Sequence, residues 1–386
     1  MATLLRSVLA QNSGQVRLCE AHDRASTELV RDAVADNGQS FDGVWISGLT
    51  QTTMLGVPDT ELVSPLRRAL LMTPVHKPMQ RNGRPLCAAF DADSGGDAKD
   101  IPALVAVLAI HGVSMIIIED KAVARPGDKV NSLLATSNAQ SQADRHEFAN
   151  VIRAFKAASA DVDVMIAARI ESFTTRAVRR DPVEEQLSVQ TALRDALERA
   201  RVYTAAGVDA VMIHSKSREP DEVLGFLNGF RAVDAATPLV VVPTAYSQTK
   251  RSVLAAAGAN VFIYANHLMR AKIKAAAEVL EDGSKADAFA GDEELRLCWR
   301  ARNYGCLLRR LAERRYLGQG QGQGQGTDEH HYGMEAEKKA LENIENAVKD
   351  LAGGQLCGCE ADARIVTVKE LLSINARQVS PAGADL

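Results

Sequence analysis

The sequence predicts an α/β fold, a TIM-type (β/α)8 barrel with a C-terminal helical extension. Three observations lead to this prediction. Eight short apolar runs recur along the chain, stretches with a period near 3.6 residues separate them, and polar residues follow the runs. Eight alternating units over about 270 residues match a TIM barrel in number and size better than an open sheet. A doubly wound sheet is the alternative, because strand number alone does not prove closure.

The expected strands are residues 15–21, 42–47, 85–92, 113–120, 163–170, 208–214, 237–243 and 259–265. Their apolar character on consecutive positions is typical of parallel strands covered on both faces. Between them, residues 188–207 and 221–233 have the period of a helix, and the first of these stretches stops at Gly207, as a C-terminal cap would.

The chain changes character after the eighth expected strand. Residues 293–319 read as one or two further helices, so we assign residues 1–317 to the barrel domain with its terminal helices. Residues 318–326 alternate Gly and Gln and are expected to form a linker. Residues 327–386 contain two amphipathic stretches and are expected to form a small helical appendage.

The composition is that of a globular protein of enzyme size. The chain has 386 residues, 46% of them hydrophobic and 24% charged, with a formal net charge of −4 and a pI of about 6.1. No global positive field is present to attract nucleic acid or an anionic membrane, so neither is expected as a partner. The N-terminus lacks a secretory signal pattern, and six cysteines are too few for a disulfide framework, so a cytoplasmic location is expected.

Acidic residues follow two neighbouring expected strands. Strand 85–92 ends in Asp91 and Asp93, which share one side of an extended chain because side chains alternate with period two, and the next strand ends in Glu119. These three acids are expected to converge at the carboxyl end of the barrel, where a hard divalent cation would relieve their repulsion. Carboxylates that leave room for water suit Mg²⁺. The alternative is that they cap loops and helices.

Basic residues follow the next two expected strands. Arg169 ends the fifth strand and His214 the sixth. An arginine can bind a carboxylate or phosphate with two parallel hydrogen bonds, so the pair predicts an anion-binding wall beside the acids. A histidine at a strand end also serves structure alone, and that alternative stays open for His214.

Nine stretches, in this order and spacing, resemble the phosphoenolpyruvate mutase branch of the isocitrate lyase superfamily. They cover nearly all of residues 15–275 and read "EAHDRAS", "VWISGLT" with "LGVPD", "FDADSGG", "IEDK", "NSLL", "ARIESF", "AVMIHSK", "VVVPTAY" and "NHLMRA". The resemblance implies a TIM-like barrel that assembles as a homodimer or homotetramer, with Mg²⁺-dependent chemistry on a small-molecule substrate. The implied reaction interconverts phosphoenolpyruvate and phosphonopyruvate and belongs to phosphonate biosynthesis.

The resemblance also implies roles for the acids and for the substrate pocket. Asp91 would bind Mg²⁺ directly, Asp93 and Glu119 would hold its waters, and Asp59 would lie near the reacting carbon and phosphorus. The pocket would cradle the substrate carboxylate on Ser47, Gly48 and Leu49, with Trp45 as a wall.

The remaining implied roles concern the phosphoryl group. Arg169 and His214 would contact the transferring group. Lys129, Asn131 and Ser132 would sit on a loop that closes over the site and excludes water, which would otherwise trap the phosphoryl group. Such a transfer needs positioning and charge neutralisation more than covalent help.

The segment after strand 113–120 separates the alternatives. Carbon–carbon lyases of the superfamily carry a cysteine there in a K-x-C-G-H type loop, whereas "PGDKVNSLL" has neither Cys nor His, which argues against lyase activity. Phosphonopyruvate hydrolase, the nearer alternative, tends to carry Thr before the Ser, so Asn131 favours the mutase. The spacer "AVARPGDKV" is longer than in the mutases, which makes the assignment of Lys129 less secure than that of Asn131. A non-catalytic barrel that acts through its C-terminal helices is the third alternative.

Overall fold

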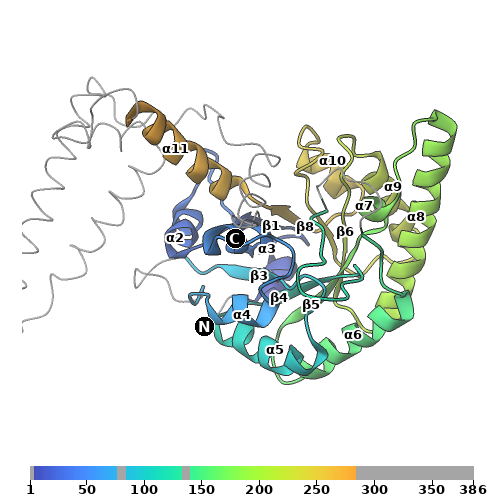
Figure 1. Cartoon of the computed structure of the whole chain (residues 1–386), viewed down its shortest axis with the longest axis horizontal. Helices are drawn as coiled ribbons and strands as arrows, with labels where there is room; N and C mark the ends of the chain where they lie inside the picture. Colours follow the sequence, from blue (N-terminus) through green and yellow to red (C-terminus); the bar gives the residue numbers. More distant parts are fainter. Residues whose placement is uncertain (1–3, 76–83, 133–139, 284–386) are drawn as a thin grey trace, which may run out of the picture. The chain divides into compact units, whose positions relative to one another are not determined.

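Eight parallel strands close into a barrel in which each strand pairs with its neighbours in sequence and β8 pairs with β1 (Figure 1). The structure is a computed structural model of the full chain and describes residues 4–75, 84–132 and 140–283. The strands are β1 Val16–Glu20, β2 Gly43–Ile46, β3 Cys87–Asp91, β4 Met115–Glu119, β5 Met165–Ile170, β6 Ala210–Ile213, β7 Leu239–Val241 and β8 Val261–Tyr264. Each lies within a run predicted from the sequence, so the predicted barrel is confirmed and the open sheet is not.

Helices alternate with the strands along the chain. They are α1 Leu5–Gln11, α2 Arg24–Asp32, α3 Gly48–Leu55, α4 Pro65–Leu70, α5 Ile101–Ile110 after the 3₁₀ turn Ala98–Asp100, α6 Arg145–Ala158, α7 Ser172–Thr175, α8 Pro182–Ala205, α9 Asp221–Arg231, α10 Arg251–Ala256 and α11 His267–Gly283. The barrel up to His267 belongs to one compact unit, and a second begins at Leu268, within α11. The predicted linker and appendage, and the helices expected at 293–319, lie outside the described residues.

Helix α8 begins earlier than the periodicity indicated. The predicted start was residue 188, but the helix starts at Pro182 because the Asp181 carboxylate accepts hydrogen bonds from the backbone N–H groups of Val183 and Glu184. Proline at the first helical position also fits, since its missing N–H would have no partner there. The predicted end is confirmed: the helix stops at Ala205, and Gly207 adopts a left-handed φ of 93°.

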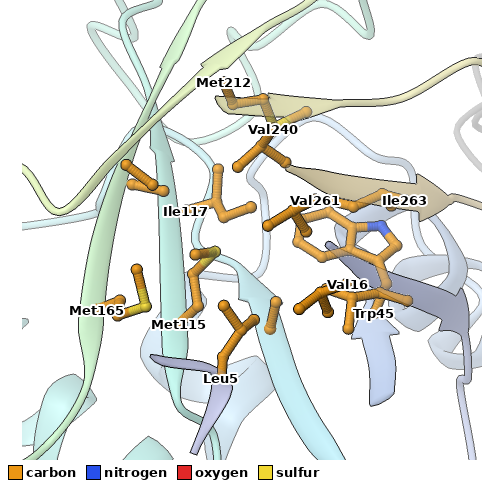
Figure 2. Close-up of a cluster of buried hydrophobic side chains, with 14 of the residues drawn as sticks. Leu5, Val16, Trp45, Met115, Ile117, Met165, Met212, Val240, Val261 and Ile263 are labelled. Carbon is orange, nitrogen blue, oxygen red and sulfur yellow. The ribbon is translucent and has the colours of Figure 1, made fainter. Parts of the chain in front are cut away.

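Apolar side chains fill the barrel interior (Figure 2). Alternate residues of the strands point inward, and Leu5 of α1 joins them at the end where the strands begin, where its backbone N–H donates to Ser114 Oγ at 3.1 Å. The barrel is therefore a packed core and not a pore, and in such barrels the active site lies at the end where the strands finish. Cys19 and Cys87 are buried free thiols, as expected for core residues.

Among the helices that the structure describes, none has both the length and the apolarity needed to cross a membrane.

Candidate active site

A cavity with a volume of about 60 Å³ lies at the carboxyl ends of the strands. The predicted site residues that line it are Trp45, Ser47, Leu49, Asp59, Asp91, Lys129, Asn131, Ser132, Arg169 and His214. The other three predicted residues lie next to these: Gly48 donates to Asp91, Asp93 accepts from Lys129, and Glu119 contacts Arg169. The structure thus brings all of the sequence-predicted site residues into one neighbourhood.

The register of the strands explains this convergence. Side chains alternate along a strand, so the second residue after an inward-facing one also faces inward. On six strands, the second residue after the last inward-facing apolar residue reaches the cavity end of the barrel. These residues are Ser47, Asp91, Glu119, Arg169, His214 and Thr244.

Asp59 is the centre of a buried cluster of charged and amide groups. Its Oδ1 accepts from Lys129 Nζ at 2.9 Å, and its Oδ2 accepts from Asn131 Nδ2 at 2.6 Å. Lys129 Nζ also donates to Asp93 Oδ1 at 2.5 Å. Burial alone would lower the pKa of Lys129, but Asp59 and Asp93 raise it well above its usual value, so the ammonium stays charged.

Asp93 reaches the cluster through a tight turn. The sequence-based argument that Asp93 lies on an extended chain with Asp91 is wrong, because its φ of 49° places it in the left-handed region. Its backbone N–H donates to Asp91 Oδ1 at 3.3 Å, and its Oδ2 accepts from Arg68 Nη2 at 2.7 Å. Although burial would raise the pKa of Asp93, Lys129 and Arg68 hold it below its usual range, so the carboxylate is ionised.

Gly48 allows the acids to approach the start of α3. Its N–H donates to Asp91 Oδ2 at 3.1 Å, and a Cβ at this position would lie 3.1 Å from Asp93 Oδ1 and 3.3 Å from Asp91 Oδ2. A side chain here would crowd both carboxylates and force them to shift by a few tenths of an ångström.

Arg68 is a structural member of the acid cluster that the sequence analysis did not identify. It is completely buried on α4 and donates to the Asp91 carbonyl at 2.6 Å, to Asp93 Oδ2, and to Gln51 Oε1 at 2.7 Å. The helical pattern does not distinguish it from the exposed Arg67, and only the tertiary structure does.

Replacing Arg68 with alanine should lower the free energy of unfolding by about 3–5 kcal/mol, because it leaves the buried Asp93 carboxylate without one of its two cations. Arg67→Ala is the matched control and should change it by less than about 0.5 kcal/mol. Urea unfolding of both variants measures the difference. Similar stabilities for the two variants would show that Arg68 does not compensate the acids.

A cationic wall faces the acids. Arg169 forms an ion pair with Glu171, contacts Glu119 Oε2 at 3.1 Å, and donates to Ser132 Oγ at 2.8 Å. His214 Nδ1 lies 3.1 Å from Arg169 Nη2 and 3.2 Å from Glu171 Oε1. Burial lowers the pKa of His214, which keeps the imidazole neutral near pH 7.

Lys121 and Glu171 support this wall, and neither was assigned a role from the sequence. Lys121 Nζ donates to Ser132 Oγ at 2.6 Å and to the Val130 carbonyl at 3.0 Å. Burial would raise the pKa of Glu171, but Arg169 and Lys121 hold it well below its usual value. Glu171 lies two residues after Arg169, so the period of a strand was the signal that could have placed it on the same side.

The long spacer between Lys121 and Lys129 crosses to the loop that carries Asp59. The Gly127 N–H donates to the Thr60 carbonyl at 3.1 Å, with Gly127 at a left-handed φ of 94°. Gln140 joins the two ends of the spacer, since its amide accepts from the Val130 N–H and donates to the Ala122 carbonyl, both at 2.7 Å. The added residues therefore place Lys129 and Asn131 against Asp59.

The acid cluster fits a cation bound largely through water. The Lys129 ammonium already lies between two of the carboxylates, and Glu119 Oε1 is buried with no hydrogen-bond partner among the described residues. Burial raises the pKa of Glu119 to about 7, although Lys121 and Arg169 oppose this. Within the described ranges, no three carboxylate, imidazole or thiolate groups converge as direct ligands. One or two carboxylates plus waters is the coordination that Mg²⁺ favours.

A closed parallel barrel with carboxylates facing an arginine, a histidine and a lysine at the carboxyl ends of its strands has the fold and the site position of TIM-barrel enzymes. Comparison with known proteins narrows this class. The profile of the family described as phosphoenolpyruvate phosphomutase matches residues 5–283. The chain belongs to this family and is an enzyme of the phosphoenolpyruvate mutase/isocitrate lyase superfamily.

Individual relatives carry two different activities. Phosphonopyruvate hydrolase of Variovorax sp. (strain Pal2) is 32% identical over 62% of this chain and 74% of that protein. The crystal structure of phosphoenolpyruvate phosphomutase from Streptomyces platensis subsp. rosaceus is 31% identical and covers 81% of this chain and 98% of its own, with a TM-score of 0.57. The crystal structure of a phosphonopyruvate hydrolase complex with oxalate and Mg²⁺ is 27% identical and covers 82% of this chain and 100% of its own, with a TM-score of 0.56. The family is established, and the comparisons leave the choice between these activities open.

Proposed function

We propose that the protein is a Mg²⁺-dependent phosphoenolpyruvate mutase that acts in phosphonate biosynthesis. The observation that carries this proposal is the bond from Asn131 Nδ2 to Asp59 Oδ2, next to the ion pair between Lys129 and the same carboxylate. Asn131 is the residue type by which the sequence favours a mutase, and its bond anchors the loop over a cavity of about 60 Å³. Asn131 also lines this cavity, and a loop that closes over a site suits a reaction that must exclude bulk water.

The reaction moves a phosphoryl group within one molecule. In phosphonopyruvate the bond between carbon 3 and phosphorus breaks, and a bond forms between phosphorus and the oxygen on carbon 2, which gives phosphoenolpyruvate without any co-reactant. The charge on the moving group is spread over its oxygens in a loose transition state, so the main task of the protein is to position and neutralise it.

The residues divide this task between them. Arg169 and His214 contact the phosphoryl oxygens, and Arg169 is held in place by Glu171 and Ser132. The start of α3, at Ser47, Gly48 and Leu49, cradles the carboxylate, and Asp59 lies beside the reacting atoms. Asp91, with Asp93 and Glu119, would hold Mg²⁺. When bound, the ion supplies positive charge that stabilises the enolate oxygen.

Phosphonopyruvate hydrolase is the second candidate, because the relative at 32% identity has that activity. Hydrolysis would add water and give pyruvate and phosphate. A coupled assay tests both candidates: purified protein with phosphonopyruvate and Mg²⁺ should produce phosphoenolpyruvate, detected with pyruvate kinase and ADP. EDTA should abolish turnover when the reaction is followed by phosphorus NMR, which needs no Mg²⁺-dependent coupling enzyme. Pyruvate formed without pyruvate kinase would instead indicate the hydrolase.

The cellular setting follows the same proposal. We infer a cytoplasmic enzyme that assembles as a homodimer or homotetramer, as the resemblance implies, and light scattering of the purified protein measures the assembly. Because the carbon–phosphorus bond is the uphill product, a downstream enzyme must consume phosphonopyruvate for net synthesis.

A further inference from the structure

Two neutral polar groups in the cavity lack hydrogen-bond partners. Thr244 and Asn266 line the cavity from the loops that follow β7 and β8. Thr244 Oγ1 and Asn266 Oδ1 are both buried, and neither has a hydrogen-bond partner among the described residues. Asn266 is only 2% exposed. A buried polar atom without a partner destabilises the protein, so two of them in one cavity point to a ligand.

The position of this pair in the barrel indicates which part of the ligand it contacts. Around the closed barrel, Arg169 lies on β5 and His214 follows β6. Strands β7 and β8 come next, and β1 then separates them from β2, which Ser47 follows. The cavity residues that follow β7 and β8 carry no charge: they are Val242, Thr244, Ala265 and Asn266. A doubly charged phosphonate is attracted to Arg169, whereas a singly charged carboxylate can be bound by neutral donors.

Both groups can donate to a carboxylate. The Thr244 hydroxyl rotates freely, and the oxygen and nitrogen of the Asn266 amide exchange places by a half-turn of the side chain. Neutral donors recognise the shape of a planar carboxylate and add no charge that would compete for the phosphonate.

We propose that Thr244 and Asn266 hydrogen-bond to the carboxylate of the substrate and complete the cradle at the start of α3. The proposal rests on the proposed function only in requiring a substrate with a carboxylate. Phosphonopyruvate meets this requirement whether the enzyme is a mutase or a hydrolase, so the choice between those activities does not affect it.

The test uses Thr244→Val, which replaces the hydroxyl by a methyl group, and Asn266→Ala, with Thr191→Val as control. Thr191 lies on α8 and does not line the active-site cavity, and its hydroxyl donates to the Leu187 carbonyl of the same helix. Calorimetric titration in the presence of Mg²⁺ measures binding of oxalate, which carries only carboxylates, and of methylphosphonate, which carries none. We expect oxalate to bind about tenfold more weakly to each cavity variant, while methylphosphonate affinity stays within twofold of the parent.

Kinetics and melting exclude a purely structural role. For phosphonopyruvate, KM should rise about tenfold with kcat within threefold, since binding is lost equally in the ground and transition states. Thr244→Val should not lower the melting temperature, because the hydroxyl bonds to no atom in the part of the chain that the structure describes. If Asn266→Ala does not fold, Asn266→Ser provides the second variant.

Two results overturn the proposal: oxalate affinity within twofold of the parent in both variants, or equal weakening of oxalate and methylphosphonate. Turnover of phosphonopyruvate by the parent separates this test from that of the proposed function. If the parent turns over no phosphonopyruvate but the variants discriminate oxalate as expected, the proposed function fails and the carboxylate contact stands. If the parent turns over phosphonopyruvate but oxalate binding is unchanged in both variants, the proposed function stands and the carboxylate contact fails.

Discussion

Replacing Asp59 with alanine should lower kcat by about 10³-fold or more while the barrel stays folded. The carboxylate is 5% exposed and binds both Lys129 and Asn131, the two residues that the spacer places over the cavity. Its loss removes both anchors of the loop and a charge that the proposed mechanism places beside the reacting atoms. Steady-state kinetics with phosphonopyruvate measures the loss, and circular dichroism shows whether the fold is retained.

Two comparison variants define what the Asp59 result means. Asp59→Asn keeps the shape but offers only one acceptor oxygen, so it should recover little activity. Asp97→Ala, which removes an exposed carboxylate paired with Lys99, should behave like the parent. Activity of Asp59→Ala within about tenfold of the parent would remove Asp59 from the mechanism, because one oriented catalytic group is worth more than that.

Replacing Arg169 with lysine should lower kcat/KM by about 10²–10³-fold even though the charge is kept. The arginine contacts Glu119, Glu171 and Ser132 at once, which fixes the direction of its planar group. A lysine has a point charge on a flexible stem and cannot make these contacts together. Because a cation remains near the buried acids, the variant should stay folded, and thermal melting checks this.

Arg176→Lys is the matched control for Arg169. Arg176 also pairs with two acids, Glu185 at 2.6 Å and Glu222 at 2.7 Å, but it does not line the active-site cavity. Its kcat/KM should stay within about threefold of the parent. If the two variants lose activity equally, Arg169 acts through general stability and not through contact with the phosphoryl group.

The barrel and much of the site could be predicted because one physical rule governs both. Side chains alternate along a strand, so a buried apolar run that ends in a charged residue places that residue at the mouth of the barrel. This rule located Asp91, Glu119, Arg169 and His214 from the sequence. The roles assigned to these residues came from the family resemblance, and they stay predictions.

The remaining features depend on contacts between distant segments. Arg68 and Arg67 are adjacent basic residues on one helix, and only packing against β3 buries the first. Asp93 joins the acids through a left-handed turn that the assumption of an extended chain did not foresee. The spacer appeared as unexplained length in the sequence, and its contact with Thr60 became visible only in three dimensions.

Phosphorus NMR of a reaction in water enriched in ¹⁸O tests the central claim most directly. Purified protein is incubated with phosphonopyruvate and Mg²⁺, and the isotope shift reports whether solvent oxygen has become bonded to phosphorus. The proposed mutase should give phosphoenolpyruvate with no ¹⁸O among the three nonbridging oxygens of its phosphoryl group, because the group moves within one molecule; the bridging oxygen comes from the keto group, which exchanges with water, and its smaller isotope shift is assigned separately. Inorganic phosphate that carries one ¹⁸O atom, formed together with pyruvate, would contradict the mutase and identify a hydrolase.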